Sequence, residues 1–120
     1  MATRALIVDD HPSFRRFARK LLESAGCEVV GDAADGAAAI AAVRELGPDL
    51  VLLDVLLPDM TGFDVAEEIA AGGNRPLIVL TSSRTASDFG SLLRTDHAKT
   101  FISKRDLTLA ALAALASEAA

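Results

Sequence analysis

The chain has 120 residues, a formal net charge of −5 and a single cysteine. This length suits one domain with a real core, the acidic balance argues against a module that itself binds nucleic acid, and one cysteine excludes a disulfide framework or a cysteine metal cluster. No apolar run approaches the roughly 20 residues of a membrane span, and the first residues lead into a strand pattern rather than a signal peptide, so we expect a cytoplasmic protein without membrane contact.

The chain opens with a strand pattern and an amphipathic helix pattern. Residues 4–9 (RALIVD) read as a buried strand that ends in the acidic pair Asp9-Asp10. The apolar residues that follow recur at helical spacing and predict an inner helix face made of Phe14, Phe17, Ala18, Leu21 and Leu22. Gly26 is expected to end this helix, and residues 27–31 read as a short second strand.

The middle of the chain repeats this order. An alanine-rich helix follows the turn at Asp35 and presents one apolar face, made of Ile40, Val43 and Leu46. Residues 50–53 are apolar throughout, which is typical of a strand buried on both faces of a parallel sheet. Asp54 comes directly after this strand, Pro58 prevents a central strand from continuing, and Gly62 permits a tight turn.

The last part of the chain supplies the remaining elements. Thr61 or Asp64 is expected to cap the helix after Asp54. A fourth strand, a short polar helix, a fifth and less apolar strand, and an Ala/Leu-rich closing helix are expected over residues 77–80, 86–94, 100–103 and 107–119. The closing helix offers four residues for burial, which are Leu109, Leu112, Ala113 and Leu115.

Strands and helices thus alternate five times along the chain. Short crossovers of this kind imply parallel strands with right-handed connections and helices on both faces of the sheet. We therefore predict an α/β fold, a doubly wound (βα)5 sandwich that forms one domain over residues 1–120.

Polar groups follow four of the five expected strands. Asp9 and Asp10 follow the first, Asp54 the third, Thr81 the fourth and Lys104 the fifth. Because the carboxyl ends of parallel strands lie at one edge of a sheet, these groups should face a common crevice. Clustered carboxylates repel one another and suit a hard divalent cation such as Mg²⁺, and they do not by themselves exclude Mn²⁺ or Ca²⁺.

The same groups are suited to phosphoryl transfer. A carboxylate can attack phosphorus to give an acyl phosphate, and a metal ion with one ammonium neutralises the phosphoryl charge. The chain has no GxxxxGK[ST] or GxGxxG motif, so we do not expect it to bind a nucleotide.

This pattern resembles the response-regulator receiver domain of two-component signalling, over essentially the whole chain. The motif consists of paired acids after the first strand, a D-x-x-x-P-x-x-x-G run, a threonine after the fourth strand, and an aromatic residue three positions before a lysine. Here these are Asp9, Asp10, Asp54, Pro58, Gly62, Thr81, Phe101 and Lys104. The resemblance implies a flavodoxin-like, five-stranded parallel sheet in the order 2-1-3-4-5.

The resemblance also implies roles for these residues. Asp54 would accept a phosphoryl group from a sensor histidine kinase, Lys104 would contact that group, and Thr81 and Phe101 would form a switch pair. Mg²⁺ would be held by Asp9, Asp10, Asp54 and the main-chain carbonyl of Leu56. Such a domain catalyses only its own phosphorylation and dephosphorylation, so we do not expect an enzyme.

Two runs, DDHPSFR and VVGDAADG, most resemble receivers attached to helix-turn-helix DNA-binding output domains. This implies control of transcription, without nucleic acid contact by this domain, and it allows a homodimer. The segment 82–99 differs most from the family, since Ser82 stands where Ala or Gly is usual and His97 where Gly is common.

Three other functions remain as alternatives. A phosphatase with an aspartyl nucleophile usually has a second acid two residues after the first, and Leu56 stands there. A phosphate-independent interaction module on the same fold normally lacks an acid or the lysine, and this chain has all of them. A flavin-binding domain would have a hydroxyl- and glycine-rich loop after the first strand, where His11 and Pro12 stand.

Overall fold

The computed structural model of the chain describes residues 2–83 and 100–119. The short helix expected over 86–94 and the loop residue His97 lie outside these residues. The described residues form one five-stranded parallel sheet in the order β2-β1-β3-β4-β5, which confirms the predicted flavodoxin-like order. The strands are β1 (Arg4–Val8), β2 (Glu28–Ala33), β3 (Leu50–Asp54), β4 (Leu77–Ser82) and β5 (Thr100–Ser103).

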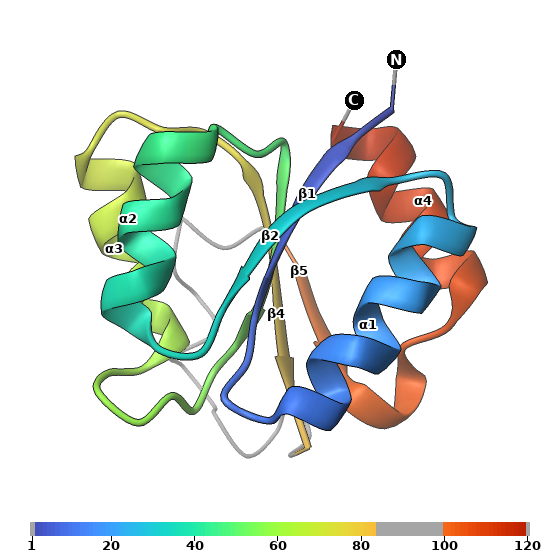
Figure 1. Cartoon of the computed structure of the whole chain (residues 1–120), viewed down its shortest axis with the longest axis horizontal. Coiled ribbons are helices and arrows are strands. Elements are labelled where there is room, and N and C mark those ends of the chain that lie inside the picture. Colours follow the sequence, from blue (N-terminus) through green and yellow to red (C-terminus); the bar gives the residue numbers. More distant parts are fainter. Residues whose placement is uncertain (1, 84–99, 120) are drawn as a thin grey trace.

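Helices cover both faces of the sheet, as Figure 1 shows. Helices α1 (Pro12–Ser24) and α4 (Leu109–Ala119) pack on one face, and α2 (Gly36–Leu46) and α3 (Gly62–Ala71) on the other. A 3-10 turn, η3 (Lys104–Asp106), follows β5. Among the described residues, no helix has the length and apolar character needed to cross a bilayer.

Strand β3 shows why a central strand of this sheet is apolar at successive positions. Leu50 and Leu52 belong to the core on the side of α1 and α4, whereas Val51 and Leu53 belong to the core on the side of α2 and α3. Because successive side chains point to opposite faces of a strand, a strand with helices on both faces needs an apolar residue at every position.

Two of the expected inner helix faces need correction. Phe17 is 48% exposed and Leu109 is 44% exposed, although both were expected to be buried. The buried stripe of α1 follows Ala18 and Leu22, and Phe17 lies to one side of it. In α4 the stripe runs along Leu112, Leu115 and Ala116; Ala113, also expected inside, is exposed on the other side of the helix.

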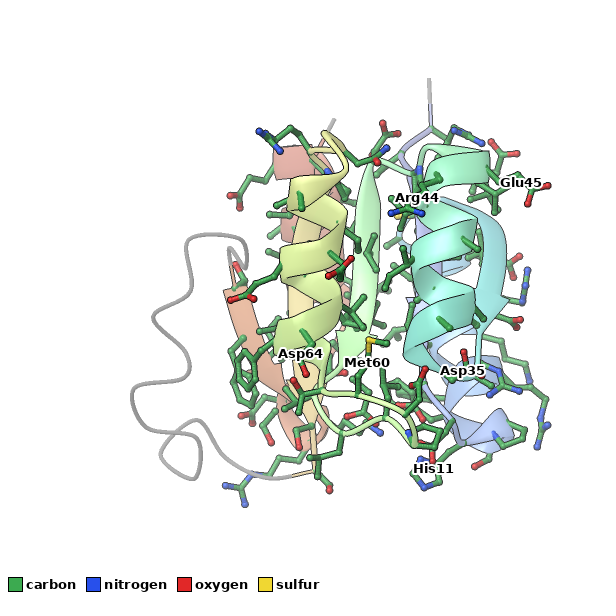
Figure 2. The ribbon with its side chains drawn as sticks, turned by 90° about the vertical axis from the view of Figure 1, so that its left-hand side faces the viewer. His11, Asp35, Arg44, Glu45, Met60 and Asp64 are labelled. Atoms are coloured by element: carbon green, nitrogen blue, oxygen red, sulfur yellow. The ribbon has the colours of Figure 1, made fainter. Side chains whose placement is uncertain are left out.

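The ends of α2 and α3 follow local capping rules. Asp35 caps α2 by accepting a hydrogen bond from the Ala38 N–H (2.8 Å). Thr61 and Asp64, which the sequence offered as alternatives, act together as a capping box at the start of α3. Figure 2 shows these two helices side by side with Met60 between them, and their first turns at the same end of the molecule as His11.

Gly62 is needed for a reason that differs from the expected one. Among the described glycines only Gly26, Gly47 and Gly73 have positive φ, so Gly62 is not required for a left-handed turn. A Cβ atom at Gly62 would instead lie 2.5 Å from the main-chain oxygen of Asp54 and 3.0 Å from the Cα of Val55. Glycine therefore lets the start of α3 pack directly against the backbone at the end of β3.

Candidate functional site

Three acids meet at the carboxyl edge of the sheet, as the sequence predicted. Asp9 follows β1 and is fully buried, Asp54 ends β3 and is 4% exposed, and the Asp10 side chain is 36% exposed. One ligand atom from each of these residues and from His11 lies within 4.8 Å of the others. Because β1 and β3 are parallel neighbours, their carboxyl ends bring the two buried carboxylates together.

Lys104 also reaches this cluster, from η3 directly after β5. Its Nζ lies 2.7 Å from Asp9 Oδ2 and 3.5 Å from Asp54 Oδ2. The same atom lies 4.2 Å from the centroid of the Phe14 ring. The lysine side chain is only 18% exposed, so one partly desolvated ammonium compensates two buried carboxylates.

The two buried acids have pKa values shifted in opposite directions. Burial raises the pKa of Asp54 to about 6; the ammonium of Lys104 opposes this shift and the nearby Asp9 carboxylate adds to it. Burial also acts to raise the pKa of Asp9, but hydrogen bonds and charge from Lys104, with hydrogen bonds from His11, hold that pKa below its usual value. Asp9 is therefore the ionised partner of Lys104, and Asp54 is the acid that lacks full compensation.

Thr81 stands next to Asp54 on the neighbouring strand. The two residues are register partners in the β3–β4 pairing, and Thr81 is 1% exposed. Its hydroxyl has no hydrogen-bond partner among the described residues. Because an unsatisfied buried hydroxyl costs about 1–3 kcal/mol, this side chain is suited to a ligand oxygen beside Asp54.

Leu56 lies beside Asp54 and Phe101 lies in the strand next to β4, while their roles as metal ligand and switch residue stay predictions. Leu56 is on the loop after β3, with its N–H 3.3 Å from Asp54 Oδ1. Phe101 is in β5, paired in register with Leu80 of β4, and packs half-buried against the core on the side of α2 and α3.

Sequence reasoning missed three residues at the start of α1. His11 Nδ1 lies 3.0 Å from Asp9 Oδ1 and 3.1 Å from Asp10 Oδ1. Arg15 donates from Nη1 to the main-chain oxygen of Asp9 (2.6 Å), and Phe14 contacts Lys104. The available signal was position, because the first turn of a helix that begins directly after the paired acids must lie beside them.

The donor set fits a hard divalent cation. Asp9, Asp10 and Asp54 supply carboxylate oxygens within a few ångströms of one another, which are the ligands that Mg²⁺ takes in proteins. Two of the three carboxylates are buried, so a bound cation would offset a desolvation cost that Lys104 only partly removes.

This fold and site define a class of small doubly wound α/β domains with a buried aspartate, further acids and a lysine at the carboxyl edge of the sheet. Residues 5–115 match the family described as "Response regulator receiver domain". The chain belongs to this family and is a receiver domain of the kind found in two-component response regulators.

Similar proteins and structures agree with this assignment. The chain is 42% identical over 90 residues to the DNA-binding response regulator MtrA of Mycolicibacterium smegmatis, covering 73% of this chain and 38% of that protein. It is 41% identical over 92 residues to the nitrate/nitrite response regulator protein NarP of Escherichia coli, covering 75% and 43%. The chain therefore spans about two fifths of the length of these relatives.

A solved structure shows the same fold over nearly the whole chain. The signal receiver domain of the putative response regulator NarL from Mycobacterium tuberculosis superposes with a TM-score of 0.85 at 30% identity, covering 98% of this chain and 96% of that one.

Proposed function

We propose that this domain is a phosphorylation-dependent signalling switch in which Asp54 accepts a phosphoryl group from the phosphohistidine of a sensor histidine kinase. The observation that carries this proposal is the environment of Asp54, a nearly fully buried carboxylate with the Lys104 ammonium 3.5 Å away and the unsatisfied hydroxyl of Thr81 on the adjacent strand.

The transfer is a displacement at phosphorus. A carboxylate oxygen of Asp54 attacks the phosphorus atom, a P–O bond forms and the P–N bond to the imidazole breaks, and the electron pair leaves with the imidazole nitrogen. Asp9, Asp10, Asp54 and the main-chain carbonyl of Leu56 would hold Mg²⁺ or Mn²⁺, which when bound would supply positive charge to neutralise the phosphoryl oxygens.

The remaining residues of the site recognise the new group. Lys104 pairs with a phosphoryl oxygen in place of the Asp54 carboxylate, and the Thr81 hydroxyl donates a hydrogen bond to another. Drawing Thr81 toward Asp54 changes the space beside Phe101, so the pair transmits the modification to the surface around β4 and β5. The domain acts only on itself, by its own phosphorylation and dephosphorylation, and not on a separate substrate.

The output we propose is transcription. The name of the relative MtrA describes a DNA-binding response regulator, and the net charge of −5 of this chain suits a domain that controls a DNA-binding partner without touching DNA itself. We place the protein in the cytoplasm. The second candidate is a phosphate-independent interaction module on the same fold.

Intact mass after incubation with acetyl phosphate, with and without Mg²⁺, tests the proposal. The expected result is a gain of one phosphoryl group that requires Mg²⁺ and is lost in Asp54→Asn. The matched control is Asp59→Asn, which changes an exposed acid on the same loop that caps α2 through the Gly36 and Ala37 N–H groups and should leave the gain intact. No gain in the wild-type protein would favour the interaction module.

A further inference from the structure

The ammonium of Lys104 is held by an aromatic ring as well as by two acids. Phe14 is in the first turn of α1, and its ring centroid lies 4.2 Å from Lys104 Nζ. A cation within about 6 Å of a ring face is attracted by the electron-rich face of the ring. The contact thus joins the segment that carries the paired acids to the turn that carries the lysine.

The ring itself is fixed in place. Phe14 is half-buried and packs against the core formed by residues of α1, α4 and the sheet. Its other aromatic neighbour is Phe17, whose ring centroid lies 6.0 Å away at an interplanar angle of 47°. Phe17 is 48% exposed, so the core contact, rather than the exposed neighbour, determines the position of the Phe14 ring.

A lysine at this site needs such a support. Its ammonium is a compact charge on a flexible four-carbon stem, and here Asp9 and Asp54 attract it from two strands, at 2.7 Å and 3.5 Å. The lysine side chain is 18% exposed, and a partly desolvated cation–π contact is stronger than an exposed one.

We propose that Phe14 is a positioning residue, whose ring holds the Lys104 ammonium over the acid cluster where the phosphoryl group arrives. This inference rests on the proposed phosphorylation of Asp54. The role is separate from the switch pair, because Phe101 packs against the core on the opposite face of the sheet. Leucine at position 14 fills similar space without the charge distribution of a ring, so the two explanations, positioning and simple packing, can be separated.

The test compares Phe14→Leu, Phe14→Tyr and the control Phe17→Leu in two measurements. The first is the rate of phosphorylation by acetyl phosphate at saturating Mg²⁺. The second is the NMR shift of the Lys104 ε-methylene protons, which a ring stacked beside them moves upfield. The chain has three lysines, Lys20, Lys99 and Lys104, so a Lys104→Arg spectrum assigns the resonance.

For Phe14→Leu we expect a rate about fivefold to tenfold lower, which corresponds to about 1–1.4 kcal/mol of cation–π energy, and loss of the upfield shift. Phe14→Tyr keeps the ring and should stay near wild type in both measurements, as should Phe17→Leu.

Two results would overturn the proposal. One is a wild-type rate and an unchanged Lys104 shift in Phe14→Leu; the other is an equal slowing in Phe14→Leu and Phe17→Leu, which would indicate a general effect on α1. If Phe14→Leu does not fold, Phe14→Met, a flexible apolar replacement, takes its place. If the wild-type protein is not phosphorylated, the proposed function fails, while the upfield Lys104 shift of the wild-type protein still tests whether the Phe14 ring contacts the lysine.

Discussion

Replacing the Asp54 carboxylate by an amide, in Asp54→Asn, should stabilise the metal-free domain at neutral pH. Burial raises the pKa of Asp54 from its usual 3.8 to about 6, so the folded protein holds the ionised form less well than the unfolded chain does. At 1.36 kcal/mol per pKa unit, the cost at pH values above 6 is about 3 kcal/mol. Because the buried amide also needs hydrogen-bond partners, we expect the free energy of unfolding of Asp54→Asn to exceed that of the wild-type protein by about 1–3 kcal/mol. Each kcal/mol corresponds to an increase of roughly 4 °C in Tm.

The pH dependence has a defined sign. Below the unfolded pKa of 3.8, Asp54 is protonated in both states, and the wild-type protein and Asp54→Asn should have similar stability. As the pH rises from 3.8 to about 6, the wild-type protein loses stability relative to the variant, and above that window the difference stays constant.

Unfolding by urea in EDTA at pH values from 4 to 8 measures this difference. Mg²⁺ should then stabilise the wild-type protein according to its concentration and affinity, and the variant much less. Asp59→Asn is a control in which the same replacement should lower stability. The N–H groups of Gly36 and Ala37 lower the pKa of Asp59, so its ionised form supports folding. If Asp54→Asn is no more stable than wild type at pH 7.5, the reasoning from buried charge is wrong.

Three further changes test packing and charge. Gly62→Ala should lower the free energy of unfolding by at least about 2 kcal/mol, because its Cβ would lie 2.5 Å from a main-chain oxygen at the end of β3 that cannot move aside. A urea midpoint equal to that of the wild-type protein would show that the backbone relaxes. Leu112→Ala, at a fully buried position, should lower the free energy of unfolding by about 2–5 kcal/mol. Leu109→Ala, at a position 44% exposed, should lower it by about 0.5 kcal/mol or less. Equal losses would contradict the assigned face of α4. Lys104→Met should lower metal-free stability at neutral pH by about 1–3 kcal/mol, since it leaves a buried carboxylate without its cation. The same variant should bind Mg²⁺ more tightly in calorimetry. Weaker binding would mean that the ammonium does not compete with the metal.

The sheet could be predicted from the sequence because its signal is local. Apolar runs such as residues 50–53 and 77–80 have one stable environment, a strand covered on both faces, and the structure places both in interior strands of the sheet, β3 and β4. The inner faces of the helices were less predictable. Phe17 and Leu109 have the hydrophobicity and approximate spacing of core residues, but they lie outside the buried stripes of their helices and are exposed.

The acids of the site and Lys104 could be predicted for a topological reason, whereas the contacts that loops and first helical turns make could not. Parallel strands bring Asp9 and Asp54 to one edge whatever the details of packing. The contact of Lys104 with the Phe14 ring and the cap that Asp59 provides to α2 depend on how loops cross between elements. Neither contact has a sequence period, so neither was visible before the fold was known.

The polar atoms that folding leaves unsatisfied lie together. In the described part of the chain, two buried hydroxyls, Thr81 Oγ1 and Ser103 Oγ, lack a hydrogen bond, and Asp9 Oδ2 has the Lys104 ammonium as its partner, at 2.7 Å. All three belong to residues at the carboxyl ends of their strands, β1, β4 and β5, and Thr81 is the register partner of Asp54, whose own ionised form is disfavoured by burial. Away from this edge, α2 and α3 have side-chain caps at their first turns, and β3 and β4 contribute apolar residues to the cores on both faces of the sheet. Among the described residues, these groups concentrate their energetic cost at the edge of the sheet where a cation and a phosphoryl group would supply the missing partners.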